Sequence, residues 1–228
     1  MAHRPFALHL HALPEGASSV SRLQLAAARM GYGAVAVGNH HDAPPPEGAV
    51  LPITQCYRVV ELRTETASRL ARLVPKLRDG VDLLAVHVES HSVLRAAVED
   101  ARVDLVCHPH RVRHGVNHVV ARLAAQRGVA LEFCYSAVVH LRGGERERAL
   151  RNLAALLALQ RRYGFPYVVA GGAWSHYDLR APRDVEALCA AFGMEPEEVR
   201  AGLEEHPVAL VERRADRGVL EEGVHLCA

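Results

Sequence analysis

"VDLLAVHVESHSVLRAAVEDARVDLVCHP", residues 81–109, contains three segments with two different hydrophobic patterns. Its two ends, VDLLAVH and VDLVCHP, are short runs of valine and leucine, which are typical of buried β-strands. The segment between them, SVLRAAVEDA, has the apolar spacing of an amphipathic helix. A strand, a helix and another strand in succession predict two parallel strands that are joined by a helical crossover.

The rest of the chain repeats this alternation. Six further runs have the composition of strands: FALHLH at 6–11, AVAVGN at 34–39, YRVVELR at 57–63, VALEFCY at 129–135, YVVAGG at 167–172 and VALVER at 208–213. Five further segments are predicted to be helices, at 18–31, 66–80, 116–128, 146–164 and 182–193. Residues that suit helix starts and ends flank them, namely Ser18, Ser19, Gly31, Gly80, Gly128, Gly164 and Gly193.

Eight strand-like runs without a glycine-rich nucleotide motif favour a closed barrel over an open sheet. We therefore predict an α/β fold, an irregular (β/α) TIM-like barrel with seven or eight mostly parallel strands. Residues 1–213 are expected to form this single domain, and 214–228 a polar C-terminal tail.

Composition limits the function classes. The formal net charge of the 228 residues is +1, so no overall electrostatic field attracts nucleic acid. Lys76 is the only lysine, and the codon bias of a GC-rich genome accounts for most of this arginine excess. Five cysteines without C-x-x-C spacing indicate reduced structural thiols. With no membrane span and no secretory signal, we expect a cytoplasmic protein.

His9 and His11 form an H-x-H pair between leucines. In a regular strand the two imidazoles would share one face, with Leu8 and Leu10 on the other. Two interpretations are open at this point. The pair ligates a cation, or it belongs to a half-exposed edge strand with no metal.

Histidines and carboxylates recur at the ends of the other predicted strands. Because barrel chemistry gathers at the carboxyl ends of the strands, these side chains are expected to meet at one mouth. Nitrogen and carboxylate ligands of this mix suit zinc, manganese or iron. The candidates at the strand ends are His9, His11, His40, His41, Asp42, Glu61, His87, His108, His110, Glu132 and His176.

The order LHLHALPEG, GYGAVAVGNHHD, VVELRT, AVHVES and CHPH resembles the polymerase-and-histidinol-phosphatase family. Phosphoesterases of that family bind two or three metals with H-x-H, H, E, H, H and a final D-x-H. The resemblance implies metal ligands at His9, His11, His40 (or His41), Glu61, His87, His108 and His176. Trp174 stands where the aspartate is expected, so at least one metal position is weakened.

A narrower resemblance covers about Phe6 to Arg213. The segments VNHVVARLAAQRGVALEF and GGAWSHYDLRAPRDVEALCAAFGM, together with residues 79–109, resemble the archaeal ribonuclease P protein component 3 family. The DLRAPRDV block is its most specific part. The resemblance implies a protein subunit of the ribonucleoprotein endonuclease that removes the 5′ leader from precursor tRNA. The catalyst is then the RNA, the partners are this RNA, other protein subunits and precursor tRNA, and the holoenzyme needs magnesium with its RNA.

Several residues keep two interpretations. The arginines Arg111, Arg113, Arg180 and Arg183 contact RNA or another subunit, or they are solvated surface residues. Pro182 and Asp184 suit the first turn of a helix. Glu132 supports a metal ligand from behind, or it pairs with an arginine inside the barrel, and the pair is favoured because a buried carboxylate needs a partner. Trp174 fills the barrel mouth or stacks on a base.

We therefore expect a subunit with no catalytic residue of its own. The histidines hold partial zinc or manganese, or they are inherited from a metal enzyme. The alternatives are a stand-alone metal-dependent phosphoesterase of the same fold and a scaffold protein without RNA.

Overall fold

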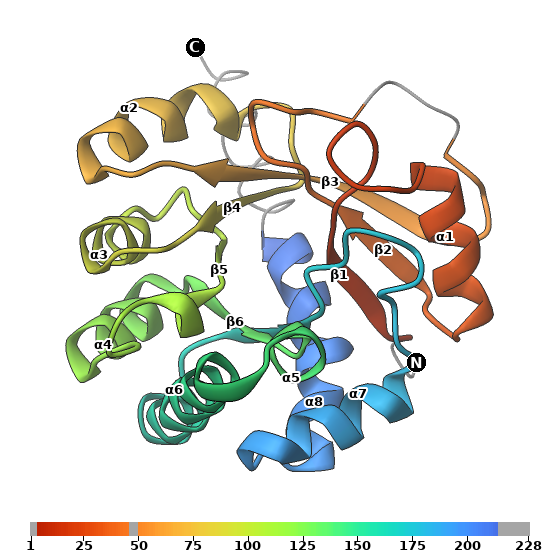
Figure 1. The fold of residues 1–228 in the computed structure, drawn as a ribbon. Coiled ribbons are helices and arrows are strands. Elements are labelled where there is room, and N and C mark those ends of the chain that lie inside the picture. Colours follow the sequence, from red (N-terminus) through yellow and green to blue (C-terminus); the bar gives the residue numbers. More distant parts are fainter. Residues whose placement is uncertain (1–3, 46–49, 214–228) are drawn as a thin grey trace.

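The structure is a computed structural model, and it describes residues 4–45 and 50–213. Seven parallel strands form one sheet in sequential order, β1 to β7 (Figure 1). The strands are β1 (Phe6–Leu10), β2 (Ala34–Val37), β3 (Gln55–Arg63), β4 (Leu83–His87), β5 (Leu105–Cys107), β6 (Ala130–Cys134) and β7 (Tyr167–Ala170). A parallel bridge between Leu10 and Ala173 brings the chain just after β7 against β1. The predicted α/β barrel with seven or eight parallel strands is therefore confirmed.

Helices cover the outside of the barrel. They are α1 (Val20–Arg29), α2 (Ala67–Arg78), α3 (His91–Glu99), α4 (His118–Arg127), α5 (Ser136–His140), α6 (Gly143–Tyr163), α7 (Pro182–Cys189) and α8 (Pro196–Leu203), with 3₁₀ turns η1 (Pro109–Arg111) and η2 (Ala190–Phe192). Side chains cap the starts of three helices, since Ser19, Thr66 and Ser90 accept backbone N–H groups at α1, α2 and α3, and of these caps the sequence predicts Ser19. Gly128 and Gly164 end α4 and α6 in the left-handed conformation.

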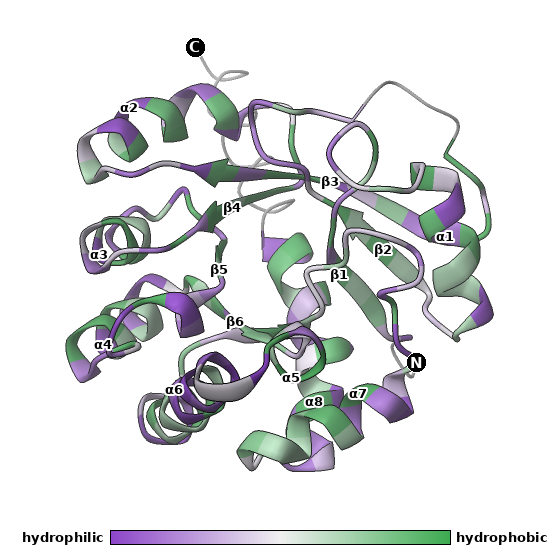
Figure 2. Cartoon of the chain, viewed as in Figure 1, coloured by the Kyte–Doolittle hydropathy of each residue, from purple (hydrophilic) through white to green (hydrophobic). Residues whose placement is uncertain are grey.

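Two apolar layers hold the barrel together. The larger lies between the strands and the surrounding helices, and the smaller fills the interior with residues such as Phe6, Leu8 and Leu83. Figure 2 shows the strands mostly hydrophobic, while the helices carry hydrophilic residues as well. No helix within residues 4–45 and 50–213 is long and apolar enough to cross a membrane.

The prediction of an eighth strand at residues 208–213 is wrong. Residues 205–213 are helical, and Leu210 packs into the interior cluster of the barrel. Leu203, Pro207 and Leu210 are buried at spacings of four and three, which is the helical period. The apolar composition of VALVER is typical of a strand, but the buried residues in this part of the chain have the spacing of a helix. The predicted tail, 214–228, lies outside the described residues.

Candidate metal centre

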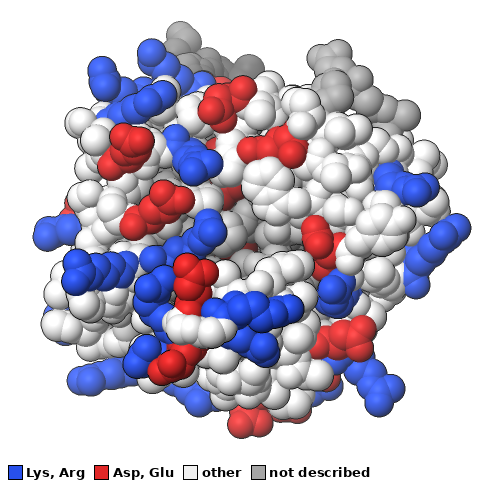
Figure 3. All heavy atoms as spheres, in the orientation of Figure 1, with Lys and Arg blue, Asp and Glu red and all other residues white. Residues whose placement is uncertain are grey.

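Six of the seven predicted metal ligands meet at one end of the barrel. They are His9, His11, His40, Glu61, His87 and His108, and they come from β1, β3, β4 and the loops after β1, β2 and β5. His11, His40, His87 and His108 line a cavity of about 420 Å³. Figure 3 shows a hollow near the centre of this face. The His9 and His11 side chains are 2% and 1% exposed, so the half-exposed edge strand is excluded.

A bulge in β1 turns the H-x-H pair inward. Leu8 packs in the barrel interior and Leu10 against the outer helices, so the two leucines do not share a face as predicted. The register of β1 shifts between Ala7 and Leu10, and His9 has a left-handed backbone with φ 62°. Such a backbone is uncommon for a non-glycine residue and is frequent at functional sites. Without this irregularity, His9 would point outward, opposite to Leu8.

Glu61 lies at the centre of the histidine cluster. Its Oε2 atom is 3.4 Å from Nε2 of His9, 3.6 Å from Nε2 of His11 and 3.4 Å from Nε2 of His40. On the other side, Oε1 lies 3.2 Å from Nδ1 of His87. Glu61 is 1% exposed, and Oε2 has no hydrogen-bond partner. A buried carboxylate oxygen that faces three imidazole nitrogens without a hydrogen bond is suited to share a cation with them.

Two other carboxylates orient these imidazoles. Nδ1 of His9 lies 2.5 Å from Oε1 of Glu132, and Nδ1 of His11 lies 3.0 Å from Oε2 of Glu15. Glu15 also contacts Nδ1 of His40 and accepts the His40 backbone N–H at 2.8 Å. A carboxylate on Nδ1 leaves Nε2 for the metal, which is the usual arrangement around protein metal ions.

The ligand groups fit a two-metal centre with a shared carboxylate. His9, His11 and Glu61 bring their ligand atoms within 4.8 Å of one another, and so do His40, Glu61 and His87. Glu61 belongs to both groups. Nitrogen and carboxylate donors of this kind suit zinc or manganese.

Burial and the neighbouring charges together set the protonation of the cluster, and they raise the pKa of His9 well above its usual value while they lower those of His11 and His108. Burial, together with the neighbouring His9, lowers the pKa of His11 to about 4. Burial also lowers the pKa of His108 well below the usual value. Burial alone would raise the pKa of Glu132, but His9 and His108 lower it to about 2. At neutral pH, His11 and His108 are therefore neutral, which is the form in which imidazoles bind metal. Glu132 is charged at the same pH.

A second layer of potential ligands lies deeper in the barrel. Cys107 groups with His9 and Glu132, and Cys134 with His108 and Glu132. Burial raises the pKa of the Cys134 thiol to about 12, so the thiol stays protonated at neutral pH. Glu132 supports the histidine ligands, which is one of its two interpretations from the sequence, whereas the favoured pairing with an arginine is wrong. It contacts His9 and accepts the His108 backbone N–H at 2.7 Å.

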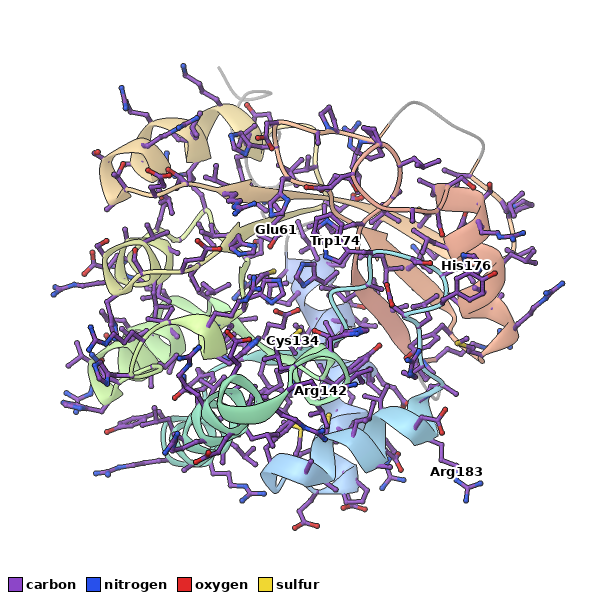
Figure 4. All side chains as sticks on the ribbon, in the orientation of Figure 1. Glu61, Cys134, Arg142, Trp174, His176 and Arg183 are labelled. Carbon is purple, nitrogen blue, oxygen red and sulfur yellow. The ribbon has the colours of Figure 1, made fainter. Side chains whose placement is uncertain are left out.

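The structure does not bring His176 into the cluster. Its Nδ1 lies 2.8 Å from the Ser18 hydroxyl and its ring packs on Tyr177. The prediction that His176 is a metal ligand of this cluster is therefore wrong. Ser18 is not the helix cap that the sequence suggests, because the N-cap of α1 is Ser19. The Trp174 ring stacks on the His11 ring, with 4.5 Å between the ring centroids, and lines the mouth cavity. Even so, 47% of Trp174 is exposed. Figure 4 places Glu61 and Trp174 near the centre of the barrel and His176 toward α1.

The four predicted arginine contacts fall in two separate regions of the surface, with Arg111 and Arg113 on one loop and Arg180 and Arg183 around the start of α7. Arg111 and Arg113 are exposed on the loop after β5. Arg183 is exposed on α7 and points outward in Figure 4. Arg180 is half-buried and donates to the backbone oxygens of Tyr177 and Leu179, both at 2.8 Å. Arg180 therefore holds its own loop, in addition to any contact with a partner.

Glu15 is the main residue of the site that sequence reasoning missed. It follows His11 by four positions on a turn, and no strand or helix pattern marks it. Cys107 was missed as well, although it immediately precedes His108 at a strand end, where barrel chemistry gathers.

Comparisons with solved structures show the same fold. A chain of an archaeal ribonuclease P in complex with mature tRNA has a TM-score of 0.73 at 22% identity, with 91% of this chain and 90% of that chain covered. Histidinol phosphate phosphatase of Lactococcus lactis, solved with zinc, L-histidinol and phosphate, has a TM-score of 0.55 at 11% identity, with 84% and 94% covered.

Sequence comparisons give the family. Ribonuclease P protein component 3 of Methanosarcina mazei is 37% identical over 222 residues, which cover 95% of this chain and 93% of the relative. The protein of the same name from Haloarcula marismortui is 36% identical over 225 residues, covering 95% of each. The model of the RNase P subunit p30 family matches residues 5–218. The chain therefore belongs to the RNase P subunit p30 family.

Proposed function

We propose that this chain is a protein subunit of ribonuclease P, the ribonucleoprotein that removes the 5′ leader from precursor tRNA. The family match over residues 5–218 carries this proposal. Its partners in the complex are the RNA component and other protein subunits, with precursor tRNA as the substrate. The catalytic RNA carries the chemistry, with magnesium on the RNA and the substrate phosphates.

The barrel mouth supports a role without catalysis. Trp174 stands where the phosphoesterases of the wider family have an aspartate, and its ring stacks on His11. His176, the other member of that motif, is turned to Ser18. One part of the expected metal-binding constellation is therefore missing, while the Glu61-centred part is present.

We assign the remaining part a partial zinc or manganese site. His9, His11, His40, Glu61 and His87 would hold the ion, and Glu15 and Glu132 would orient the imidazoles. A bound ion would supply charge neutralisation around the buried Glu61 carboxylate. The chain's own residues provide the cage and its orientation.

We place the complex in the cytoplasm. The cysteines of the described residues, Cys56, Cys107, Cys134 and Cys189, are all free thiols, which suits a reducing compartment.

Reconstitution tests the proposal. The RNA component and the other protein subunits from the same source are assembled with and without this chain, and cleavage of 5′-labelled precursor tRNA is measured. We expect the chain to raise the cleavage rate and to co-purify with the RNA. No effect on cleavage, together with metal-dependent hydrolysis of phosphate esters by the chain alone, would support the stand-alone phosphoesterase instead.

A further inference from the structure

A groove rich in arginine lies beside the barrel mouth, between the loop after β5 and helix α6. Arg111 and Arg113 line it from the loop, and Arg148 and Arg151 line it from α6. We call these four residues and the space between them the arginine groove. Its volume is about 780 Å³. Figure 3 shows basic side chains gathered beside the central hollow.

The two walls of the groove are fastened to each other. The Asn152 amide donates to the backbone oxygen of His110 at 2.8 Å, and so ties the loop to α6. On the other side, Nε2 of His91 donates to the backbone oxygen of Arg113 at 3.0 Å. The loop that carries Arg111 and Arg113 is therefore held in place before any ligand binds, which lowers the entropic cost of binding.

Most of the positive charge of the arginine groove is not neutralised by acidic side chains. Arg151 lies 3.7 Å from Glu147 in an exposed pair, which is a weak interaction. Arg111, Arg113 and Arg148 have no ion pair with any residue of 4–45 and 50–213. Glu89 also lines the groove, but its carboxylate faces Arg63 and His87 instead.

The lining favours a phosphate ligand over a protein surface. Protein interfaces have an apolar centre, whereas Ala155 is the only apolar residue in the lining of the groove among the described residues. Guanidinium groups bind phosphate oxygens through paired hydrogen bonds. Several unpaired arginines in one cleft are typical of a nucleic-acid backbone site.

The arginine groove continues into the barrel mouth. Arg111 lines the mouth cavity, the groove and the smaller cavity between them, and Arg148 lines the last two. A strand that follows the groove would therefore end near the histidine cluster.

We propose that the arginine groove binds the phosphate backbone of the RNA component of the complex, an inference that rests on the proposed function. Arg111 and Arg148 sit where the cavities meet and make the central contacts. The contacts position the RNA on the protein without selecting a base sequence.

Charge reversal in the assembled complex tests this inference. The probe is the RNA component transcribed from the source organism, titrated with the complete set of protein subunits at several salt concentrations. The test variant is Arg111→Glu with Arg148→Glu. The control variant is Arg22→Glu with Arg72→Glu, which makes the same charge change at exposed positions on α1 and α2. Thermal unfolding is measured on both variants to check that they fold.

We expect the groove variant to weaken RNA binding by about tenfold or more and to slow precursor tRNA cleavage, while the control changes binding less than about twofold. Replacing the two groove arginines by alanine should lower the slope of log affinity against log salt by about 1 for each contact.

Two results would overturn the inference alone: equal RNA binding by the groove and control variants, or loss of a protein subunit from the groove variant with RNA affinity unchanged. If the unmodified chain itself has no effect on cleavage, the proposed function fails instead.

Discussion

The carboxylate of Glu132 lies 2.5 Å from Nδ1 of His9, and both side chains are buried in the barrel. This contact fixes the orientation of the imidazole, so that Nε2 faces Glu61 at 3.4 Å. Glu15 has the same relation to His11 and His40. Two carboxylates, Glu132 and Glu15, thus aim three imidazoles at one oxygen of Glu61, an arrangement that supports the proposed metal site.

Replacing Glu15 by glutamine should therefore weaken metal binding. The amide keeps the size of the side chain but loses the charge that orients and polarises His11 and His40. Removal of such an outer partner typically costs about 10- to 100-fold in metal affinity. The affinity is measured by competition with a chromophoric zinc chelator.

Glu99→Gln is the matched control, because Glu99 is an exposed residue of α3 paired with Arg95, away from the mouth. Equal zinc affinity in the Glu15 variant and the unmodified chain would show that the orientation by Glu15 has no part in metal binding.

Trp174→Asp should raise metal occupancy at the mouth. The substitution returns a carboxylate to the position of the missing ligand, next to His11. We expect the chain purified without chelators or a nickel step to hold less than about one equivalent of zinc or manganese, and the variant to hold more. Metal content is measured by mass spectrometry, and Trp174→Ala separates the new carboxylate from the loss of the ring. Two retained equivalents in the unmodified chain would contradict the partial site.

Much of the fold follows from patterns that act locally. The strand–helix alternation, Ser19 at the start of α1 and Gly128 at the end of α4 depend on neighbours in sequence, and all three are confirmed. The strand prediction for residues 208–213 failed because their packing is not local. Leu210 fills the interior of the barrel, where its neighbours are strands distant in sequence.

The site was predictable where a ligand stands at a strand end. Glu61 and His87 are such residues, and parallel strands bring their carboxyl ends together. The inward turn of His9 was not predictable, because it depends on a bulge that the alternation conceals. The role of Glu15 depends on how one turn folds over the mouth, and the loop geometry that turns His176 to Ser18 is equally non-local.

Arg180 and Arg183 should respond differently to alanine substitution. Arg183 is exposed on α7, so its loss should change the free energy of unfolding by less than about 0.5 kcal/mol. Arg180 donates to two backbone oxygens, and losing those bonds should cost about 1 kcal/mol. Urea denaturation measures both. If Arg180→Ala is as stable as the unmodified chain, its backbone contacts contribute nothing and only a partner contact remains for it.

Asp104→Ala should destabilise the barrel strongly. Asp104 contacts NH1 of Arg78 at 2.6 Å and accepts the Leu84 backbone N–H at 2.8 Å, with both charged side chains buried. Removing one partner of a buried ion pair typically costs about 3–5 kcal/mol, because the other charge stays in the interior. Glu147→Ala, at an exposed pair, should change stability by less than about 0.5 kcal/mol. Equal unfolding midpoints in urea for these two variants would be inconsistent with this role of Asp104.

The chain alone should have no useful phosphoesterase activity, even with metal supplied. A metal-dependent hydrolase needs an ion with an open position for water or substrate. At this mouth the Trp174 ring stacks on His11, and His176 lies outside the ligand cluster. We expect no turnover of phosphate monoesters or diesters above the rate without protein, in zinc or in manganese. The measurement is release of a chromogenic phenolate, with Glu61→Gln as the control for contaminating hydrolases, since a contaminant is unaffected by that change. Turnover that disappears in both Glu61→Gln and His9→Ala would show that the histidine cluster is catalytic. The mouth would then have kept phosphoesterase chemistry in spite of the missing aspartate.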